Sequence, residues 1–346
     1  MSKRLLVWNG GSGKATAIDQ LRELLGDNDT TSVEITPNVN LSEVIFTAVR
    51  KGCDTLIAAG GDGTVNAVVN AVMALEATNR PRVGIVPLGT ANDFAGTLAI
   101  PADVAEAVAV LSDDLLVPMD VVRITSDNFE RYYANMAAGG NSVRVSEELT
   151  EEVKAKWGAF CYIRGAVGVL GDLQSFHITA NCDGEMIEMD SWAVLVANGK
   201  TNAGRILVAP LASPADGLLD IILIQNGSML DMIEIVSKTL LSSFLDSDQV
   251  IFRQARQLKL HSVPGMRFTI DGEVIDEEPI QFDVVPQAIQ MFVGADFYNQ
   301  HAPSVPAASR VSEAHPSPAG PMAPAQSVGP AQVVDPLATS QGPGSP

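Results

Sequence analysis

The chain has few residues of the kinds that build disulfide frameworks, metal clusters or nucleic-acid-binding surfaces. It contains 3 cysteines and 4 histidines in 346 residues, and neither set shows the spacing of a metal site. The cysteines, Cys53, Cys161 and Cys182, are odd in number, which indicates reduced core thiols in a cytosolic protein. Lysine and arginine number 22 against 41 acidic residues, and the net charge of −19 argues against nucleic acid as a partner.

Long apolar runs are also missing from the sequence. No run approaches the roughly 20 apolar residues of a membrane-spanning helix. The opening MSKRLLVWNG enters a strand directly, so no signal peptide is expected. The acidic charge disfavours a broad electrostatic attraction to anionic lipid, so any membrane contact should be local and largely hydrophobic.

The most informative part of the sequence is residues 54–67, DTLIAAGGDGTVNA. A short apolar run typical of a buried parallel strand is followed by GGDGT at 60–64 and then by apolar residues at helical spacing. A strand that ends at a glycine turn and restarts as a helix presents free backbone N–H groups and the helix dipole to an anion. Glycines also let phosphate oxygens approach the backbone. The alternative is a capped turn without a ligand.

Three more turns are expected at the same edge of a sheet. Strands are predicted at 3–8, 32–36 and 83–87, with helices at 14–25 and 41–51 between them. This alternation predicts a doubly wound parallel α/β domain with helices on both faces of the sheet. Ligands bind such sheets at the carboxyl ends of the strands, where residues 9–13, Thr36 and the Gly89-Thr90 turn all fall.

The second half of the chain has a different texture. Extended segments dominate it, and several alternate as in half-buried antiparallel strands: 116–125, 131–137, 174–182, 191–198, 218–225, 250–262, 266–271 and 279–285. They predict a β-rich, sandwich-like domain. The last residues are rich in proline, alanine and serine and cannot bury enough surface to order themselves. We expect domains at 1–120 and 121–300 and a disordered tail at 301–346.

Two strings carry a family resemblance. GGDGT at 60–64 and P-x-GT-x-NDFA at 87–95 closely resemble the signatures of the bacterial diacylglycerol-kinase-like lipid kinases. NAD kinases share the GGDG core but lack the NDFA continuation. The resemblance covers residues 3–296 and implies the same two-domain plan with an active site in the cleft between the domains.

The family resemblance also implies cofactors, partners and a location. The implied cofactors are ATP and Mg²⁺. The implied partners are a nucleotide and a lipid substrate at the membrane surface. The implied location is the cytoplasm, with transient membrane association. It leaves a homodimer open. Nucleotide-binding roles then fall on Asn9, Gly10, Gly11, Ser12, Gly13, Thr36, Gly61, Asp62, Gly63, Thr64, Val65, Asn66 and Thr90. Asp62 is expected to face a catalytic Mg²⁺ directly or through water.

Residues 213–220, SPADGLLD, form a turn that leads into a strand. Carboxylate and carbonyl oxygens are the ligands that Mg²⁺ prefers, although an ordinary Asx turn has the same sequence. The family resemblance implies a structural Mg²⁺ held by the Asp216 side chain and by backbone oxygens of Ser213 and Leu218. Asp120 either joins the same network or makes a capping or interdomain hydrogen bond.

The string FTIDGE at 268–273 has the shape of a β-hairpin with Asp-Gly at its turn. The family carries a DGE motif at this location, and the resemblance implies that it supplies the general base. We assign that role to Glu273, with Asp271 as the close alternative or as its partner.

The sequence therefore predicts an ATP-dependent lipid kinase that phosphorylates the hydroxyl of diacylglycerol or a related lipid. Two other functions stay open on the same fold. One is NAD-kinase-like phosphorylation of a soluble nucleotide, and the other is a nucleotide-binding regulator without turnover.

Overall fold

The computed structural model describes most of the chain up to His301, and Met1–Ala302 form one compact unit. The described residues are 3–12, 17–26, 29–143, 173–202, 204, 206–228, 231, 234–235, 238, 245, 247–270, 273–275 and 280–301. Gly13, Asp271 and the predicted tail after residue 301 lie outside this description. None of the described helices is long and apolar enough to cross a membrane.

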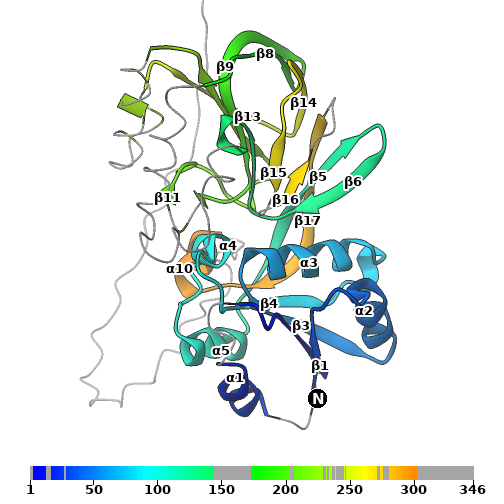
Figure 1. Ribbon diagram of the computed structural model, residues 1–346. Coiled ribbons are helices and arrows are strands. Elements are labelled where there is room, and N and C mark those ends of the chain that lie inside the picture. Colours follow the sequence, from blue (N-terminus) through cyan, green and yellow to red (C-terminus); the bar gives the residue numbers. More distant parts are fainter. Residues whose placement is uncertain are drawn as a thin grey trace, which may run out of the picture. The chain divides into compact units, whose positions relative to one another are not determined.

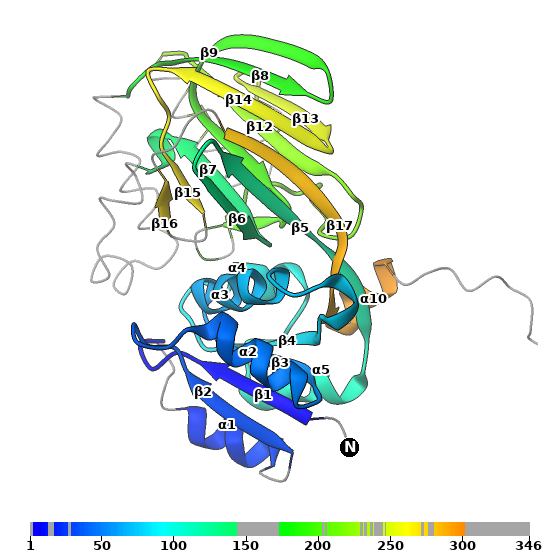
Figure 2. The same ribbon diagram turned by 90° about the vertical axis from the view of Figure 1, so that its right-hand side faces the viewer.

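The first part of the chain folds around a parallel sheet, as predicted. Its strands lie in the spatial order β4 (Arg82–Pro87), β3 (Cys53–Gly60), β1 (Lys3–Trp8) and β2 (Thr30–Glu34). Leu6, Ile57 and Val86 are fully buried, because helices cover the sheet on both sides. Opposite faces carry two pairs of contacting helices (Figures 1 and 2): α1 (Ile18–Leu25) with α5 (Val104–Asp113), and α2 (Leu41–Arg50) with α3 (Asp62–Met73).

The second part of the chain is antiparallel and β-rich, which confirms the predicted class. Its main strands are β5 (Leu116–Ser126), β6 (Phe129–Tyr133), β7 (Met136–Gly140), β8 (Phe176–Cys182), β9 (Glu185–Ala197), β12 (Leu219–Gln225), β13 (Val250–Ala255), β14 (Gln257–Val263), β15 (Phe268–Ile270), β16 (Glu273–Ile275) and β17 (Ile280–Phe292). Side chains of these strands form an apolar core in which the rings of Tyr133, Phe268 and Phe282 are fully buried, and further side chains of β7, β9 and β12 form a second apolar cluster. A two-stranded hairpin, β10 (Thr201–Asn202) with β11 (Ile206–Leu207), stands apart from the large sheet.

Strand β17 joins the two parts of the chain. It pairs with β14 along its first half and with β5 on both sides of an irregularity between Val285 and Ile289, and it places Met291 beside Val83 of β4 in parallel. The predicted segment 279–285 was therefore too short, because Pro286 and Gln287 interrupt the apolar alternation just where the strand bends. Gln287 has a positive φ of 50° there. The predicted segment 131–137 is likewise two strands, β6 and β7, separated at Ala134-Asn135.

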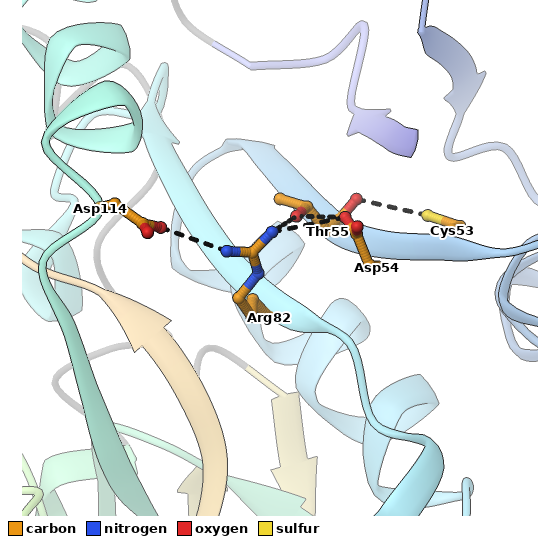
Figure 3. A network of polar contacts seen from close by, with 5 residues as sticks. All are labelled: Cys53, Asp54, Thr55, Arg82 and Asp114. Carbon is orange, nitrogen blue, oxygen red and sulfur yellow. Dashed lines mark hydrogen bonds and ion pairs between the residues drawn. The ribbon is translucent and has the colours of Figure 1, made fainter. Parts of the chain in front are cut away.

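Arg82 ties together the amino ends of β3 and β4 and the end of α5 (Figure 3). Its guanidinium donates to Thr55 Oγ1 at 3.1 Å and lies 3.5 Å from an Asp54 carboxylate oxygen and 3.2 Å from one of Asp114. It also lies over the Phe292 ring of β17, 5.5 Å from the centroid. A planar group with several donors suits such a junction better than a lysine would.

We expect Arg82→Met to lower the free energy of unfolding by about 1–2 kcal/mol, measured by urea denaturation. The fork of hydrogen bonds is lost while the apolar stem is retained. Arg253→Met, which removes an exposed ion pair with Glu185 at 3.0 Å, is the matched control and should change stability by less than about 1 kcal/mol. Equal losses in the two variants would contradict a structural role for the Arg82 junction.

Candidate functional site: a phosphate-sized cavity at the carboxyl edge

Two glycine turns touch at the carboxyl edge of the parallel sheet. The Leu88 N–H donates to the Gly60 carbonyl at 3.0 Å, which brings the turn after β4 against the turn after β3. A Cβ atom on Gly89 would lie 2.4 Å from the Cα of Gly61 and 2.8 Å from Asn92 Oδ1. Both turns therefore require glycine for their close approach, independently of any ligand.

The touching turns line an open cavity of about 190 Å³. Its walls come from the turns after β1, β3 and β4, and the residues are Asn9, Gly11, Ser12, Gly61, Gly63, Thr64, Gly89 and Thr90. Seven of these eight are predicted nucleotide-binding residues, and Gly89 belongs to a turn that the sequence analysis had already placed at this edge. Because α3 begins at Asp62, the cavity lies at a helix N-terminus, which favours an anion such as phosphate.

Asp62 turns away from this cavity and onto the NDFA segment. The Asp93 N–H donates to Asp62 Oδ2 at 3.1 Å, and the Phe94 N–H donates to Asp62 Oδ1 at 3.0 Å. Both carboxylate oxygens thus accept from the first turn of α4 (Asp93–Thr97). This contact links the two signature strings physically, and the sequence analysis, which oriented Asp62 toward Mg²⁺, did not predict it.

Asn92 closes the turn after β4. It adopts a left-handed conformation (φ 52°, ψ 45°), which asparagine tolerates better than most residues. Its side chain accepts from the Gly89 N–H at 2.9 Å and donates to the Gly89 carbonyl at 2.7 Å. The asparagine of the NDFA string therefore shapes one wall of the cavity.

The remaining predicted nucleotide-binding residues that the structure describes do not line the cavity. Gly10 packs closely against Glu34, and Thr36 lies two residues beyond the end of β2. Val65 is a buried core residue whose N–H donates to the Gly61 carbonyl at 3.2 Å. Asn66 lies on α3 near Tyr132 of β6.

The β10–β11 hairpin of the second domain docks on the NDFA segment. The Gly204 N–H donates to Asp93 Oδ2 at 3.1 Å, and Thr201 Oγ1 donates to the Asp93 carbonyl at 3.1 Å. The Lys200 N–H donates to Thr97 Oγ1 at 3.1 Å. Asp93 is 4% exposed, so α4 is held between the phosphate-sized cavity on one side and the second domain on the other.

The predicted base lies on the β15–β16 hairpin, and Glu273 pairs with Ile270. Ile270 in turn pairs with Ala137 of β7, two residues from Asn135. Asn135 donates from Nδ2 to the Thr201 carbonyl at 3.1 Å. The Glu273 backbone therefore lies toward the end of β7 at which the second domain meets the NDFA segment.

The predicted metal loop has the geometry of an Asx turn. The Leu218 N–H donates to Asp216 Oδ1 at 2.9 Å, and the Asp216 N–H is 3.4 Å from the Ser213 carbonyl. Asp120 holds this loop: it is 1% exposed, and its carboxylate accepts from the N–H groups of Gly217 and Gln287, both at 2.7 Å. Burial raises the pKa of Asp120, while these two hydrogen bonds oppose the rise.

A third carboxylate, that of Asp220, lies near enough to this loop to feel the charge of Asp216. Asp220 is 1% exposed, its Oδ1 accepts from Gln254 Nε2 at 2.9 Å, and its Oδ2 is buried without a hydrogen-bond partner. Burial, with a further contribution from the charge of Asp216, raises the pKa of Asp220 to about 6. No group of three or more His, Cys, Asp or Glu side chains among the described residues is arranged to hold a metal. The metal site predicted at Ser213, Asp216 and Leu218 differs from such a group, because it uses one carboxylate and two backbone carbonyls. The buried Asp220 oxygen without a hydrogen-bond partner suits a nearby positive charge.

We expect Asp220→Asn to stabilise the protein in EDTA at pH 7.5 by about 2–3 kcal/mol. The folded state binds a proton at Asp220 that the unfolded state releases between about pH 4 and pH 6. The stabilisation of the folded state by protonated Asp220 is therefore present at low pH and lost as pH rises through 6. Thermal unfolding of wild type and variant at pH 5 and pH 7.5 measures it. Added Mg²⁺ should raise the wild-type Tm more than the variant Tm, and equal shifts would contradict a cation near Asp220.

The parallel α/β domain with glycine turns at the carboxyl edge of its sheet, followed by an antiparallel β-rich domain, is the two-domain plan that the sequence predicted. The family model described as the diacylglycerol kinase catalytic domain matches residues 3–124. The one described as the YegS C-terminal NAD kinase beta sandwich-like domain matches residues 135–293. The chain belongs to the diacylglycerol-kinase-like lipid kinase family.

Individual relatives support the same assignment. A Serratia proteamaculans protein named "Probable lipid kinase YegS-like" is 31% identical over 291 residues, which are 83% of this chain and 92% of that protein. A diacylglycerol kinase of Staphylococcus haemolyticus is 29% identical over 253 residues, 73% of this chain and 75% of the relative. The crystal structure of a Bacillus anthracis diacylglycerol kinase superposes with a TM-score of 0.71 at 23% identity, covering 85% of this chain and 98% of that one, which shows the shared fold.

Proposed function

We propose that the protein is an ATP-dependent kinase that transfers the γ-phosphate to the hydroxyl of diacylglycerol or a related lipid alcohol. The observation that carries the proposal is the cavity of about 190 Å³ at the start of α3. It combines backbone groups at a helix N-terminus with small side chains, in a chain whose relatives include named diacylglycerol kinases. The triphosphate would lie along the turns after β1, β3 and β4.

In this proposal the protein contributes positioning and one proton acceptor. Mg²⁺ bound with ATP supplies charge neutralisation, and a structural Mg²⁺ would be held by Asp216 with the backbone oxygens of Ser213 and Leu218. Asp62 anchors α4 and thereby fixes the NDFA segment beside the phosphate-sized cavity. Glu273 takes the proton from the acceptor hydroxyl as the hydroxyl oxygen attacks the γ-phosphorus and the bond from this phosphorus to the bridging oxygen breaks, which releases ADP. Asp271 is the alternative proton acceptor.

The lipid would be met at the membrane surface by a cytoplasmic protein that associates with it transiently. NAD-kinase-like phosphorylation is disfavoured, because the NDFA segment that NAD kinases lack is built into this site through Asp62 and Thr201. A regulator without turnover remains the alternative if no acceptor is phosphorylated.

Transfer of label from γ-labelled ATP tests the proposal. Mixed micelles containing diacylglycerol, monoacylglycerol, sphingosine or polyprenol are compared with NAD, each with Mg²⁺. We expect label in one lipid. Label in NAD alone would refute the lipid kinase, and ATP binding without any labelled acceptor would favour the regulator.

A further inference from the structure

An edge strand of the second domain is paired by a side chain of helix α3 instead of by another strand. Strand β6 pairs only with β5 among the described strands. The Tyr132 N–H donates to Asn70 Oδ1 at 3.0 Å, and Asn70 Nδ2 donates to the Tyr132 carbonyl at 2.8 Å. The carboxamide therefore engages both backbone groups of Tyr132, as a peptide unit of a neighbouring strand would.

The Asn70 carboxamide also contacts Asn66, which lies one helical turn closer to the cavity on α3. Asn66 precedes Asn70 by four residues and lies on the same face of α3. Asn70 Nδ2 also lies 2.6 Å from Asn66 Oδ1, and Asn66 Nδ2 lies 3.4 Å from the Tyr132 carbonyl. The two amides and the β6 backbone thus form one network that spans about one turn of the helix.

Helix α3 also carries part of the proposed phosphate site. It begins at Asp62, and both Gly63 and Thr64 line the phosphate-sized cavity. An α-helix is stiff over the two turns that separate these residues from Asn70. Fixing Asn70 against β6 therefore fixes the cavity wall relative to the antiparallel domain, as the arrangement of α3 below β6 illustrates (Figure 1).

We infer that Asn70 is a positioning residue: it holds helix α3, and with it the phosphate-sized cavity, in register with the domain that carries Glu273. The inference rests on the proposed phosphotransfer between these two parts of the chain. Misplacement of reacting groups by about 1 Å is enough to lower a rate by about a hundredfold. ATP itself would still find an intact cavity, because every residue that lines the cavity belongs to the first domain.

The chain offers a matched control for Asn70. Arg80 Nη1 donates to the Ala288 carbonyl of β17 at 3.0 Å, so it too joins the first part of the chain to a strand that continues into the second. Arg80 follows α3 and does not line the cavity. An isosteric variant, Asn70→Asp, keeps the shape of the side chain but puts an oxygen where Nδ2 donates to Tyr132.

Steady-state kinetics of the full chain tests the inference. We expect Asn70→Ala and Asn70→Asp to lower kcat about tenfold or more, with the KM for ATP within about twofold of wild type. Arg80→Ala should lower the Tm but leave kcat unchanged at a temperature where all variants are folded. Wild-type kcat in Asn70→Asp, or an equal loss in Arg80→Ala, would overturn the positioning role.

Hydrogen exchange separates this inference from the proposed function. Without nucleotide, the Tyr132 amide should exchange at least about tenfold faster in Asn70→Ala than in wild type and in Arg80→Ala. Unchanged exchange at Tyr132 would refute the contact whether or not the protein is a kinase. If the Tyr132 amide exchanges faster in Asn70→Ala while the wild-type protein phosphorylates no acceptor, the contact between Asn70 and β6 stands and only the proposed reaction is refuted.

Discussion

Glu273→Gln is expected to lower kcat for phosphotransfer by about 10²–10³-fold while ATP binding is retained. Glutamine keeps the size and hydrogen-bonding reach of the side chain but cannot accept the proton of the attacking hydroxyl. The predicted nucleotide site lies on the first domain, whereas the Glu273 backbone belongs to the β15–β16 hairpin of the second. Single-turnover transfer from labelled ATP, with a parallel binding titration, separates the two effects.

Two further variants make this result specific. Glu185→Gln changes an exposed carboxylate of the same domain and should leave kcat unchanged. Asp271→Asn decides which carboxylate of the DGE string accepts the proton, since the variant that lacks the true acceptor should show the larger loss of kcat. Wild-type kcat in Glu273→Gln would contradict its role as the base.

Gly63→Ala and Gly89→Ala should separate ligand binding from folding. No atom lies within 4 Å of a Cβ built on Gly63, its φ is not positive, and alanine favours a helix more than glycine does. Gly63→Ala should therefore fold with an unchanged or raised Tm, yet bind ATP at least about tenfold more weakly, because the new methyl group enters the cavity that would hold phosphate.

Gly89→Ala should fail on both counts. Its Cβ would lie 2.4 Å from the Gly61 Cα, so one of the two turns must move, with a loss of about 1–3 kcal/mol in stability. Calorimetric titration with ATP and thermal unfolding measure the pair. Full ATP affinity in Gly63→Ala would show that the nucleotide phosphates bind elsewhere.

The location of the glycine turns could be predicted from the sequence, because the carboxyl ends of parallel strands lie at one edge of a sheet. Strands that alternate with helices become parallel, parallel strands end at one edge, and residues 9–12, 61–64 and 89–90 follow three such strands. The family resemblance added the roles of Glu273 and Asp216, which no periodicity could supply.

Other features depended on tertiary contacts that periodicity does not report. Asp62 had two local possibilities, a metal or a cap, and the distant segment that it caps is fixed only when β3 and β4 pair. Asn70 occupied an ordinary polar position on a predicted helix, and its partner is a backbone 62 residues away. The extent of strand β17 was underestimated because it bends at Pro286-Gln287, between its pairing with β14 and its pairing with β4.

Cavity size alone would have chosen another site. A larger cavity, of about 920 Å³, lies beside β2 and α2 and reaches Lys3 and Cys53 at the amino ends of β1 and β3. The start of α2 lines it, but there the Asn40 side chain already accepts from the Glu43 N–H, and neither α3 nor the touching glycine turns reach it. The smaller cavity is the better candidate, because its backbone geometry matches phosphate and because the signature strings converge on it.

A crystal structure with Mg²⁺ and a non-hydrolysable ATP analogue tests the central claim most directly. We expect phosphate oxygens in the cavity of about 190 Å³, within hydrogen-bond distance of the Gly63 N–H and of polar groups of Ser12, Thr64 or Thr90. The analogue bound in the larger cavity at the amino ends of the strands, with this cavity filled only by water, would contradict it.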